Sequence, residues 1–453
     1  MAVDFTYRLR VPHRPGSLER VSGAIGRAGG LIGDVETIKI GRETSIREIT
    51  IESEDDEHAD RLEQALSEMD EVEVLERRDR ALIRHEGGKL KTVPCHPLAT
   101  FQDTRDAYTP GVARACLAIA NDPSEAARYT MIPRTVAICT NGTRVLGLGD
   151  IGPLAAMPVM EGKALFYAQF AGISAWPILV DTRDPSEFVE AVARIAPSFG
   201  GIHLEDISAP ECYEIEARLI ERLDQPVMHD DVHGTAAVSV GAAMLASHEA
   251  GVELEASTVG QVGLGAAGLG IASLMVEAGA RRVIASDPKE ETHAVARERG
   301  VEVVDMDTVM AEADLVVATS GRPGLIEPAM VRDGQVILAL SNPSPEIRPE
   351  DAREAGAALA FDGAVVNNVL GYPGIFRGAL LAGATEINST MKLAAARAIS
   401  EMSSEAELMP DPLDPRVHEW VAQAVGEAAR ESGVAQRSRM PPGDGRNGGG
   451  PPS

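Results

Sequence analysis

Aromatic residues, lysine and cysteine are all scarce in this chain of 453 residues. Phe, Trp and Tyr make up only 4% of it, so the hydrophobic core must be built from Ala, Val, Leu and Ile. The four cysteines form no Cys-x-x-Cys pair and have no metal-ligand spacing, which indicates reduced thiols and a cytoplasmic protein. No hydrophobic run approaches the ~18–20 residues of a membrane span. The alternation of polar and apolar residues in MAVDFTYRLR (residues 1–10) does not fit a signal peptide.

Positive charge is also in short supply, because 42 Lys and Arg face 69 Asp and Glu for a formal net charge of −27. Such a surface repels nucleic acids and anionic lipids, so we expect no nucleic-acid partner and no membrane partner. Only six of the 42 basic residues are lysines, so a lysine among small apolar residues stands out. The hydrophobic content of 44% and the charged content of 25% are typical of a soluble globular protein.

The first 85 residues predict a small domain of their own. Polar and apolar residues alternate in FTYRLRV (5–11), as in a half-buried strand, and apolar residues then recur at helical spacing over 18–28. Two strand-like stretches follow at 31–40 and 45–53, then an amphipathic helix over 59–69 and a last strand over 71–77. The order β-α-β-β-α-β is that of a ferredoxin-like unit.

This segment, about residues 3–80, resembles an ACT domain, a module that binds amino acids or similar metabolites and regulates attached enzymes. The resemblance depends on the junction between the first strand and the first helix, where Arg14, Pro15, Gly16 and Ser17 occupy the place at which ACT domains approach a ligand. It implies a small-molecule effector and a homodimer or larger assembly. An assembly module without a ligand is the alternative, because this element order serves many functions.

The clearest motif of the chain is GLGAAG (263–268), which has the form G-x-G-x-x-G. A strand-like stretch precedes it, a helix of small apolar residues follows, and the next strand ends at Asp287. The glycines allow close approach to a pyrophosphate at the helix N-terminus. Asp287 would accept a hydrogen bond from the ribose 2′-hydroxyl, which favours NAD, whereas Lys289 keeps NADP open. The predicted backbone contacts of the cofactor are Gly263, Gly265, Ala266, Ala267 and Gly268.

Three asparagines follow strand-like stretches in the same part of the chain. Further strands are predicted within 301–305, 313–321 and 334–346, which together indicate a doubly wound sheet. Asn342, Asn367 and Asn368 come after such strands, where their amides could face a cofactor or a carboxylate. Turn formation is the ordinary role of asparagine at these places.

Two acidic pairs also follow strand-like stretches. Glu205 and Asp206 end the stretch SFGGIHLED (198–206), and Asp230 and Asp231 come after another apolar stretch. Carboxylates gathered at strand ends suit Mg²⁺ or Mn²⁺. In a chain with 69 acidic residues such pairs also arise by chance. The histidines that flank the second pair are interpreted as structural or supporting groups.

Lys163 is the lysine that stands among small apolar residues, near the predicted start of a helix. Burial lowers the pKa of a lysine and suits it to act as a general base. A side chain that reaches to the solvent is the alternative. Arg144 lies in a glycine-rich turn after the strand-like RTVAICT (134–140), and Tyr108 precedes a Pro-Gly turn.

Together these residues resemble the malic enzyme family. The matching motifs span about residues 95–400 in the family's order, with the spacing of its shorter prokaryotic type, and an ACT domain ahead of them departs from its simplest architecture. The motifs are YTPGV (108–112), RVLGLGDIG (144–152), EGK (161–163), ED (205–206), HDDVHGT (229–235), GLGAAG (263–268), SNP (341–343) and NN (367–368). The resemblance implies oxidative decarboxylation of (S)-malate to pyruvate and CO₂ with reduction of NAD, or of NADP.

The resemblance also implies a role for each motif. Lys163 would remove the hydroxyl proton of malate while hydride passes to the nicotinamide, and Tyr108 would then protonate C3 of enolpyruvate. Asp230 would assist the metal or Lys163, and Arg144 would pair with a malate carboxylate. Substrate and cofactor would be contacted by Asn342, Asn367 and Asn368. The ligands of Mg²⁺ or Mn²⁺ would be Glu205, Asp206 and Asp231.

The predicted fold class is therefore α/β with three domains. We assign 1–85 to the ACT domain, 86–234 to the N-terminal catalytic domain of a malic enzyme and 235–435 to a Rossmann-type NAD(P)-binding domain. The tail 436–453 is rich in Pro and Gly and is predicted to be disordered. Three alternatives remain open: a malolactic-type enzyme that retains NAD, an amino-acid dehydrogenase without the metal set, and a non-catalytic ACT-linked metabolite sensor.

Overall fold

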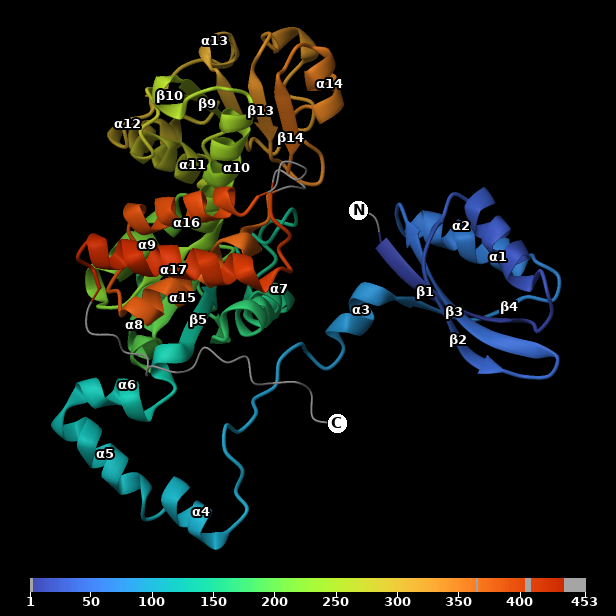
Figure 1. Ribbon diagram of the computed structural model, residues 1–453, viewed down its shortest axis with the longest axis horizontal. Coiled ribbons are helices and arrows are strands. Elements are labelled where there is room, and N and C mark those ends of the chain that lie inside the picture. The colour runs from blue at the N-terminus through green and yellow to red at the C-terminus, as the bar shows by residue number, and fades with distance from the viewer. Residues whose placement is uncertain (1–2, 364–365, 404–408, 436–453) are drawn as a thin grey trace. The chain divides into compact units, whose positions relative to one another are not determined.

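The computed structural model describes residues 3–363, 366–403 and 409–435, and the predicted tail lies outside them. The chain divides into two compact units, Met1–Lys91 and Thr92–Ser453, which are described separately (Figure 1). The boundary between the units is close to the predicted end of the first domain. Within the described residues there is no helix long and apolar enough to span a membrane.

The N-terminal unit has the predicted order β-α-β-β-α-β. Its elements are β1 (Val3–Pro12), α1 (Ser17–Arg27), β2 (Leu31–Ile40), β3 (Thr44–Ser53), α2 (Asp56–Ser67) and β4 (Glu73–Asp79), followed by α3 (Arg80–His85). The strands form an antiparallel sheet in the order β2-β3-β1-β4. Alternate residues of β1 and β3, among them Tyr7 and Ile49, are buried in one core with Val21 of α1 and Leu62 of α2. The other face of the sheet therefore carries the polar residues of both strands.

A four-stranded parallel sheet forms the first half of the second unit. Its strands are β5 (Thr135–Thr140), β6 (Ser174–Leu179), β7 (Gly201–Leu204) and β8 (Val227–His229), in the order β6-β5-β7-β8. The helices α7 (Pro153–Phe166), α8 (Pro185–Ile195) and α9 (Glu211–Arg222) connect them. Ahead of the sheet come α4 (Phe101–Ala107), α5 (Val112–Asn121) and α6 (Ala126–Tyr129). All six residues of β5 are buried, as expected for a central parallel strand.

A six-stranded parallel sheet forms the second half. Its strands are β9 (Thr258–Val262), β10 (Arg282–Ser286), β11 (Glu302–Val303), β12 (Leu315–Ala318), β13 (Val336–Ala339) and β14 (Leu359–Asp362). Their order is β11-β10-β9-β12-β13-β14, so the direction of winding reverses between β9 and β12. This is the order of a doubly wound Rossmann sheet, in which ligands bind beyond the carboxyl ends of the strands at the reversal.

The remaining helices cover and join the two sheets. They are α10 (Thr235–Glu249), α11 (Ala266–Glu277), α12 (His293–Glu298), α13 (Met306–Glu312), α14 (Pro349–Glu354), α15 (Tyr372–Ala382), α16 (Ser389–Glu401) and α17 (Pro415–Glu431). A single apolar cluster contains Val136 of β5, Val259 of β9 and Ala396 of α16. Figure 1 shows α15, α16 and α17 packed beside the β5 sheet although they come last in the described chain.

Candidate active site

The two predicted acidic pairs lie together at one edge of the β5 sheet. Glu205 and Asp206 follow β7, and Asp230 and Asp231 follow the neighbouring parallel strand β8, in the π-helical turn η5 (Asp230–Gly234). Ligand atoms of Glu205, Asp206 and Asp231 all lie within 4.8 Å of one another. The backbone N–H of Asp206 donates to Asp231 Oδ2 at 3.0 Å, which fixes the distance between the two strand ends.

In this carboxylate cluster Glu205 and Asp206 are buried and Asp231 is partly exposed, and too little positive charge lies nearby to balance the three carboxylates. Burial and the neighbouring carboxylates raise the pKa of Glu205 to about 7 and of Asp206 to about 8, although Lys163 opposes both shifts. Asp206 is only 3% exposed, and its Oδ2 has no hydrogen-bond partner among the described residues. An all-oxygen donor set with an unpartnered buried oxygen fits a hard divalent cation such as Mg²⁺ or Mn²⁺.

Lys163 lies beside these carboxylates, but not where the local sequence placed it. It occupies the last turn of α7 rather than the start of a helix, because the helix begins ten residues earlier at Pro153, after Gly152. Its Nζ pairs with Asp230 and, at 3.1 Å, with Glu205 Oε1, and lies 4.6 Å from the ring centroid of Tyr372. The expected lowering of its pKa is wrong for this arrangement. Burial does lower the pKa of Lys163, but Asp230 and Glu205 outweigh burial and raise it well above its usual value.

His203 and Tyr167 complete the site and are missing from the predicted set. His203 Nε2 lies 2.6 Å from Glu205 Oε2, and its Nδ1 lies 2.9 Å from the hydroxyl of Tyr167, in the turn η3 (Tyr167–Ala171). Burial lowers the pKa of His203 to about 4, so the ring is neutral. With Glu205 ionised, Nε2 carries the ring proton and donates to Glu205, while Nδ1 accepts from Tyr167. The sequence contains a pattern that could have predicted His203. It precedes Glu205 by two residues, and residues two apart in a strand lie on the same face.

Of the three predicted asparagines, one contacts the carboxylate cluster and the other two form hydrogen bonds elsewhere. Asn368 Nδ2 donates to Asp230 Oδ2 at 3.3 Å and to Thr235 Oγ1 at 2.8 Å, so it belongs to the cluster. Asn367 is exposed and caps the short helix η9 (Asn368–Leu370) by accepting from the N–H of Val369. Asn342 lies two residues after Leu340 and is exposed. Its Nδ2 is 3.4 Å from the carbonyl oxygen of Gly363.

The glycine motif forms the predicted turn between β9 and α11. Gly263 has φ 93, and Gly268 lies so close to the carbonyl of Gly263 that a Cβ would sit 2.0 Å from that oxygen. Gly265 precedes α11, and Ala266 and Ala267 form its first turn, so their N–H groups are available to an anion. Asp287 accepts from the N–H of Leu264 at 2.7 Å through one carboxylate oxygen, which fastens the acidic residue to the loop.

Known proteins match the chain along nearly its whole length. Residues 87–220 match the profile "Malic enzyme, N-terminal domain" and residues 357–431 match "Malic enzyme, NAD binding domain". NAD-dependent malic enzyme 1 of Bacillus subtilis is 49% identical to the chain over 94% of it and 97% of that protein. The chain belongs to the malic enzyme family. The predicted family and its NAD-binding domain are thereby confirmed.

Two further matches extend the malic enzyme assignment. The NAD-dependent malic enzyme of Geobacillus stearothermophilus is 41% identical over 98% of both chains. A crystal structure of malic enzyme from Pyrococcus horikoshii shares 38% identity with a TM-score of 0.74, covering 79% of this chain and 91% of that one. Residues 230–321 also match the NAD-binding domain of D-isomer specific 2-hydroxyacid dehydrogenases, in agreement with the Rossmann sheet described above.

Two residues of the malic enzyme motifs, Arg144 and Tyr108, differ in their position relative to the carboxylate cluster. The backbone N–H of Arg144 donates to the carbonyl of Asp206 at 3.1 Å, so this exposed arginine is anchored next to the cluster. Tyr108 directly follows α4 and is 72% exposed. Figure 1 shows α4 and α5 well separated from α7, which carries Lys163. The tyrosines near Lys163 in the described chain are Tyr167 and Tyr372.

The predicted effector residues line a cavity of about 370 Å³ in the N-terminal unit, together with Arg47. Gly16 has φ 83 and precedes α1, whose N-terminus has no side-chain cap. The hydroxyl of Ser17 is buried, with no hydrogen-bond partner in the described part of the chain. Arg14 forms an ion pair with Glu71. The loop therefore offers helix N–H groups, a hydroxyl and arginine side chains to a small ligand.

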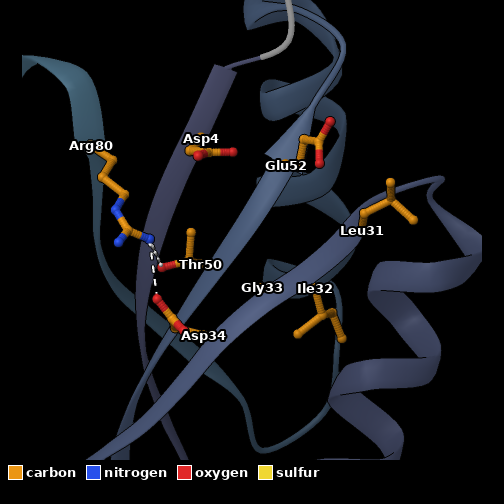
Figure 2. Close-up of a pocket in the computed structure, with 8 residues that line it drawn as sticks. All are labelled: Asp4, Leu31, Ile32, Gly33, Asp34, Thr50, Glu52 and Arg80. Carbon is orange, nitrogen blue, oxygen red and sulfur yellow. Dashed lines mark hydrogen bonds and ion pairs between the residues drawn. The ribbon is translucent and has the colours of Figure 1, made fainter. Parts of the chain in front are cut away.

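A second hollow of about 210 Å³ lies on the opposite face of the same sheet (Figure 2). Asp4 and Glu52 line it, and Arg80 reaches across to Thr50 at 3.4 Å and Asp34 at 3.3 Å. None of its lining residues belongs to the loop with Arg14 and Ser17, so the loop cavity remains the candidate effector site.

Proposed function

We propose that the chain oxidatively decarboxylates (S)-malate to pyruvate and CO₂ while reducing NAD, with Mg²⁺ or Mn²⁺ bound by Glu205, Asp206 and Asp231. The observation that carries the proposal is the position of Lys163 Nζ, which contacts both Asp230 and Glu205 at the edge of the carboxylate cluster. A base next to a divalent-cation site is what deprotonation of a 2-hydroxy acid requires.

In this proposal each group of the site has its own part in the reaction. Glu205, Asp206 and Asp231 would hold a divalent cation, which would supply Lewis-acid chemistry at the hydroxyl and carboxylate oxygens of the substrate. A cation there would offset the carboxylate charge that raises the pKa of Lys163 and would favour its neutral amine. The neutral amine would accept the hydroxyl proton as hydride leaves C2 for the nicotinamide, and Asp230, which contacts Nζ, would take the proton onward. Arg144 pairs with a substrate carboxylate. After CO₂ leaves, a tyrosine hydroxyl protonates C3 and completes pyruvate.

A malate assay with Mn²⁺ and each nucleotide tests the reaction. Equal amounts of NADH and pyruvate are expected, abolished by EDTA and restored by Mn²⁺. Lactate without net NADH would instead indicate the malolactic reaction, and a Bacillus subtilis relative at 42% identity is named bifunctional malic/malolactic enzyme. Activity that survives EDTA would reject the metal set. Complete lack of turnover with either nucleotide would favour the non-catalytic sensor.

NAD is the preferred nucleotide in this proposal, because Asp287 directly follows β10 and its carboxylate is fixed to the glycine loop. A carboxylate there binds the 2′-hydroxyl of NAD and repels the 2′-phosphate of NADP. Asp287→Ser should therefore lower the ratio of kcat/KM for NAD to that for NADP. Lys289→Ala is the matched control for the neighbouring charge, and an unchanged ratio in Asp287→Ser would reject the role.

We propose that the protein acts as a homodimer or larger, in which α4 and α5 pack on a second copy and bring Tyr108 to its Lys163. Every residue of α4 and α5 is at least partly exposed, including Phe101 at 79% and Leu117 at 64%. Tyr108→Phe and Lys163→Ala should each be inactive, and co-expressing them should restore activity that neither has alone. Tyr372→Phe tests the tyrosine beside Lys163, and a loss confined to that variant would assign the proton to Tyr372.

For the N-terminal unit, we propose the ACT function of binding a small metabolite at the loop Arg14, Pro15, Gly16 and Ser17. Its support is the loop cavity and the unpartnered hydroxyl of Ser17. Calorimetric titration of the full chain with amino acids and central carboxylates should find a ligand that changes malate turnover, with weaker binding in Ser17→Ala. No binding would leave the unit as an assembly module. A cytoplasmic location remains a prediction from the cysteines.

A further inference from the structure

A carboxylate outside the proposed metal ligands holds both ends of the turn that carries Asp230 and Asp231. Glu216 lies on α9 and is only 7% exposed. Its Oε1 accepts the backbone N–H of His229 at 2.7 Å, immediately before the turn η5, and its Oε2 lies 2.9 Å from His233 Nε2, inside the turn. One side chain therefore bridges the residues on either side of the two aspartates.

The hydrogen bond from the backbone N–H of His229 to Glu216 pairs a group that the sheet leaves unpaired. β8 is the last strand of the order β6-β5-β7-β8, so an N–H on its outer side must find an acceptor other than a strand. Burial opposes ionisation of Glu216, but the hydrogen bond from His233 and the charge of Lys392 outweigh burial and lower its pKa. The acceptor is therefore a carboxylate, which forms stronger hydrogen bonds than a neutral group.

Lys392 extends this arrangement to the C-terminal helices. Its Nζ, on α16, lies 3.2 Å from His233 Nδ1. Because Nε2 of His233 faces the carboxylate of Glu216, that nitrogen carries the ring proton and Nδ1 accepts from Lys392. The chain of contacts runs from Lys392 through the His233 ring and the Glu216 carboxylate to the backbone of His229.

We propose that Glu216 is a positioning residue of the metal site, which fixes Asp230 and Asp231 by bridging the two ends of their turn, with Lys392 orienting His233 for that bridge. The inference rests on the proposed metal site at Glu205, Asp206 and Asp231. Glu216 touches neither a metal nor the substrate. Its effect reaches the cation through the position of the turn.

Mn²⁺ binding without malate tests the proposal, measured by the electron paramagnetic resonance signal of free Mn²⁺. Glu216→Gln keeps an oxygen for one of the two bonds only, and we expect it to weaken Mn²⁺ binding by roughly 10–100-fold. Lys392→Met, of similar length, should weaken it in the same direction but less. The matched control is Glu214→Gln, which removes the same charge from an exposed position of α9 that pairs with Arg218. NADH binding should stay within about twofold in all three, since outer partners of a metal site act chiefly on the metal.

The Mn²⁺ dependence of malate turnover distinguishes a positioning role of Glu216 from a general loss of folding. In Glu216→Gln the Mn²⁺ concentration for half-maximal activity should rise while kcat at saturating Mn²⁺ stays close to the wild-type value. Mn²⁺ binding equal to that of Glu214→Gln in both other variants would overturn the proposal. So would parallel losses of Mn²⁺ and NADH binding with a lower unfolding temperature. If Glu216→Gln does not fold, Lys392→Met decides in the same way. Wild-type protein that binds no Mn²⁺ would instead reject the proposed metal site itself.

Discussion

Gly270 provides the sharpest test of how the nucleotide loop is held against the metal turn. It lies on α11, which begins at the glycine motif, and a Cβ added there would sit 2.3 Å from the carbonyl oxygen of Val232 in η5. Ordinary contact begins near 3.4 Å, so Gly270→Ala must push the helix and the turn apart by about 1 Å. Overpacking of this kind costs roughly 1–3 kcal/mol of stability. A misplacement of ~1 Å can lower the rate on the order of 10²-fold.

The expected result is a separation of binding from chemistry. Each ligand is held by one side of the contact, so Mn²⁺ and NADH should bind Gly270→Ala almost normally when titrated singly. The kcat for malate should nevertheless fall on the order of 10²-fold, because the nicotinamide no longer meets C2 at the correct distance. Gly426→Ala is the control, since its Cβ would find a neighbour at 3.5 Å, an ordinary contact, within a helix. A kcat in Gly270→Ala within threefold of this control would refute the reasoning.

Three further predictions address the cluster directly. Lys163→Ala should lower malate oxidation by about 10²–10⁴-fold, as loss of a general base does, while NADH titration is unchanged; turnover within tenfold of wild type would remove Lys163 from the reaction. Tyr167→Phe leaves His203 Nδ1 buried without its donor, a cost of ~1–3 kcal/mol, and should weaken Mn²⁺ binding about tenfold; unchanged Mn²⁺ binding would argue against that role. Raised pKa values of about 7 for Glu205 and about 8 for Asp206 mean that the metal-free fold holds protons that the unfolded chain has released. The melting temperature in EDTA should therefore fall from about pH 5 to about pH 8 and recover with Mn²⁺, and a flat profile would contradict the shifts.

Strand ends were the most informative feature of the sequence. Parallel neighbours finish at the same edge of a sheet, so two acidic pairs that each follow a strand come together, as Glu205 and Asp231 do. The same logic predicted the glycine turn before α11 and the position of Asp287. Alternation along β1 and the order β-α-β-β-α-β were equally accessible, because period and element order are local properties.

The features of the site that could not be predicted from the sequence depend on contacts between residues far apart in the chain. Glu216 is one of 69 acidic residues, and only its packing against η5 distinguishes it from the exposed Glu214 on the same helix. The apolar residues after Lys163 predict a helix that starts near it, whereas the helix begins at Pro153. The direction of the pKa shift of Lys163 depended on Asp230, which lies 67 residues away. The exposed position of Tyr108 is likewise invisible to local pattern.

The boundary predicted between residues 234 and 235 falls where η5 passes directly into α10, with no linker between them. Ala237 and Val240 of α10 share one apolar cluster with Val136 of the first sheet and Val259 of the second. Residues 92–234 and 235–435, expressed as separate polypeptides, would each expose half of that cluster to water. We expect such halves to be insoluble alone and to unfold in a single transition when covalently joined, so that homologous recombination within this family should tolerate crossovers near residue 91 far better than near residue 234.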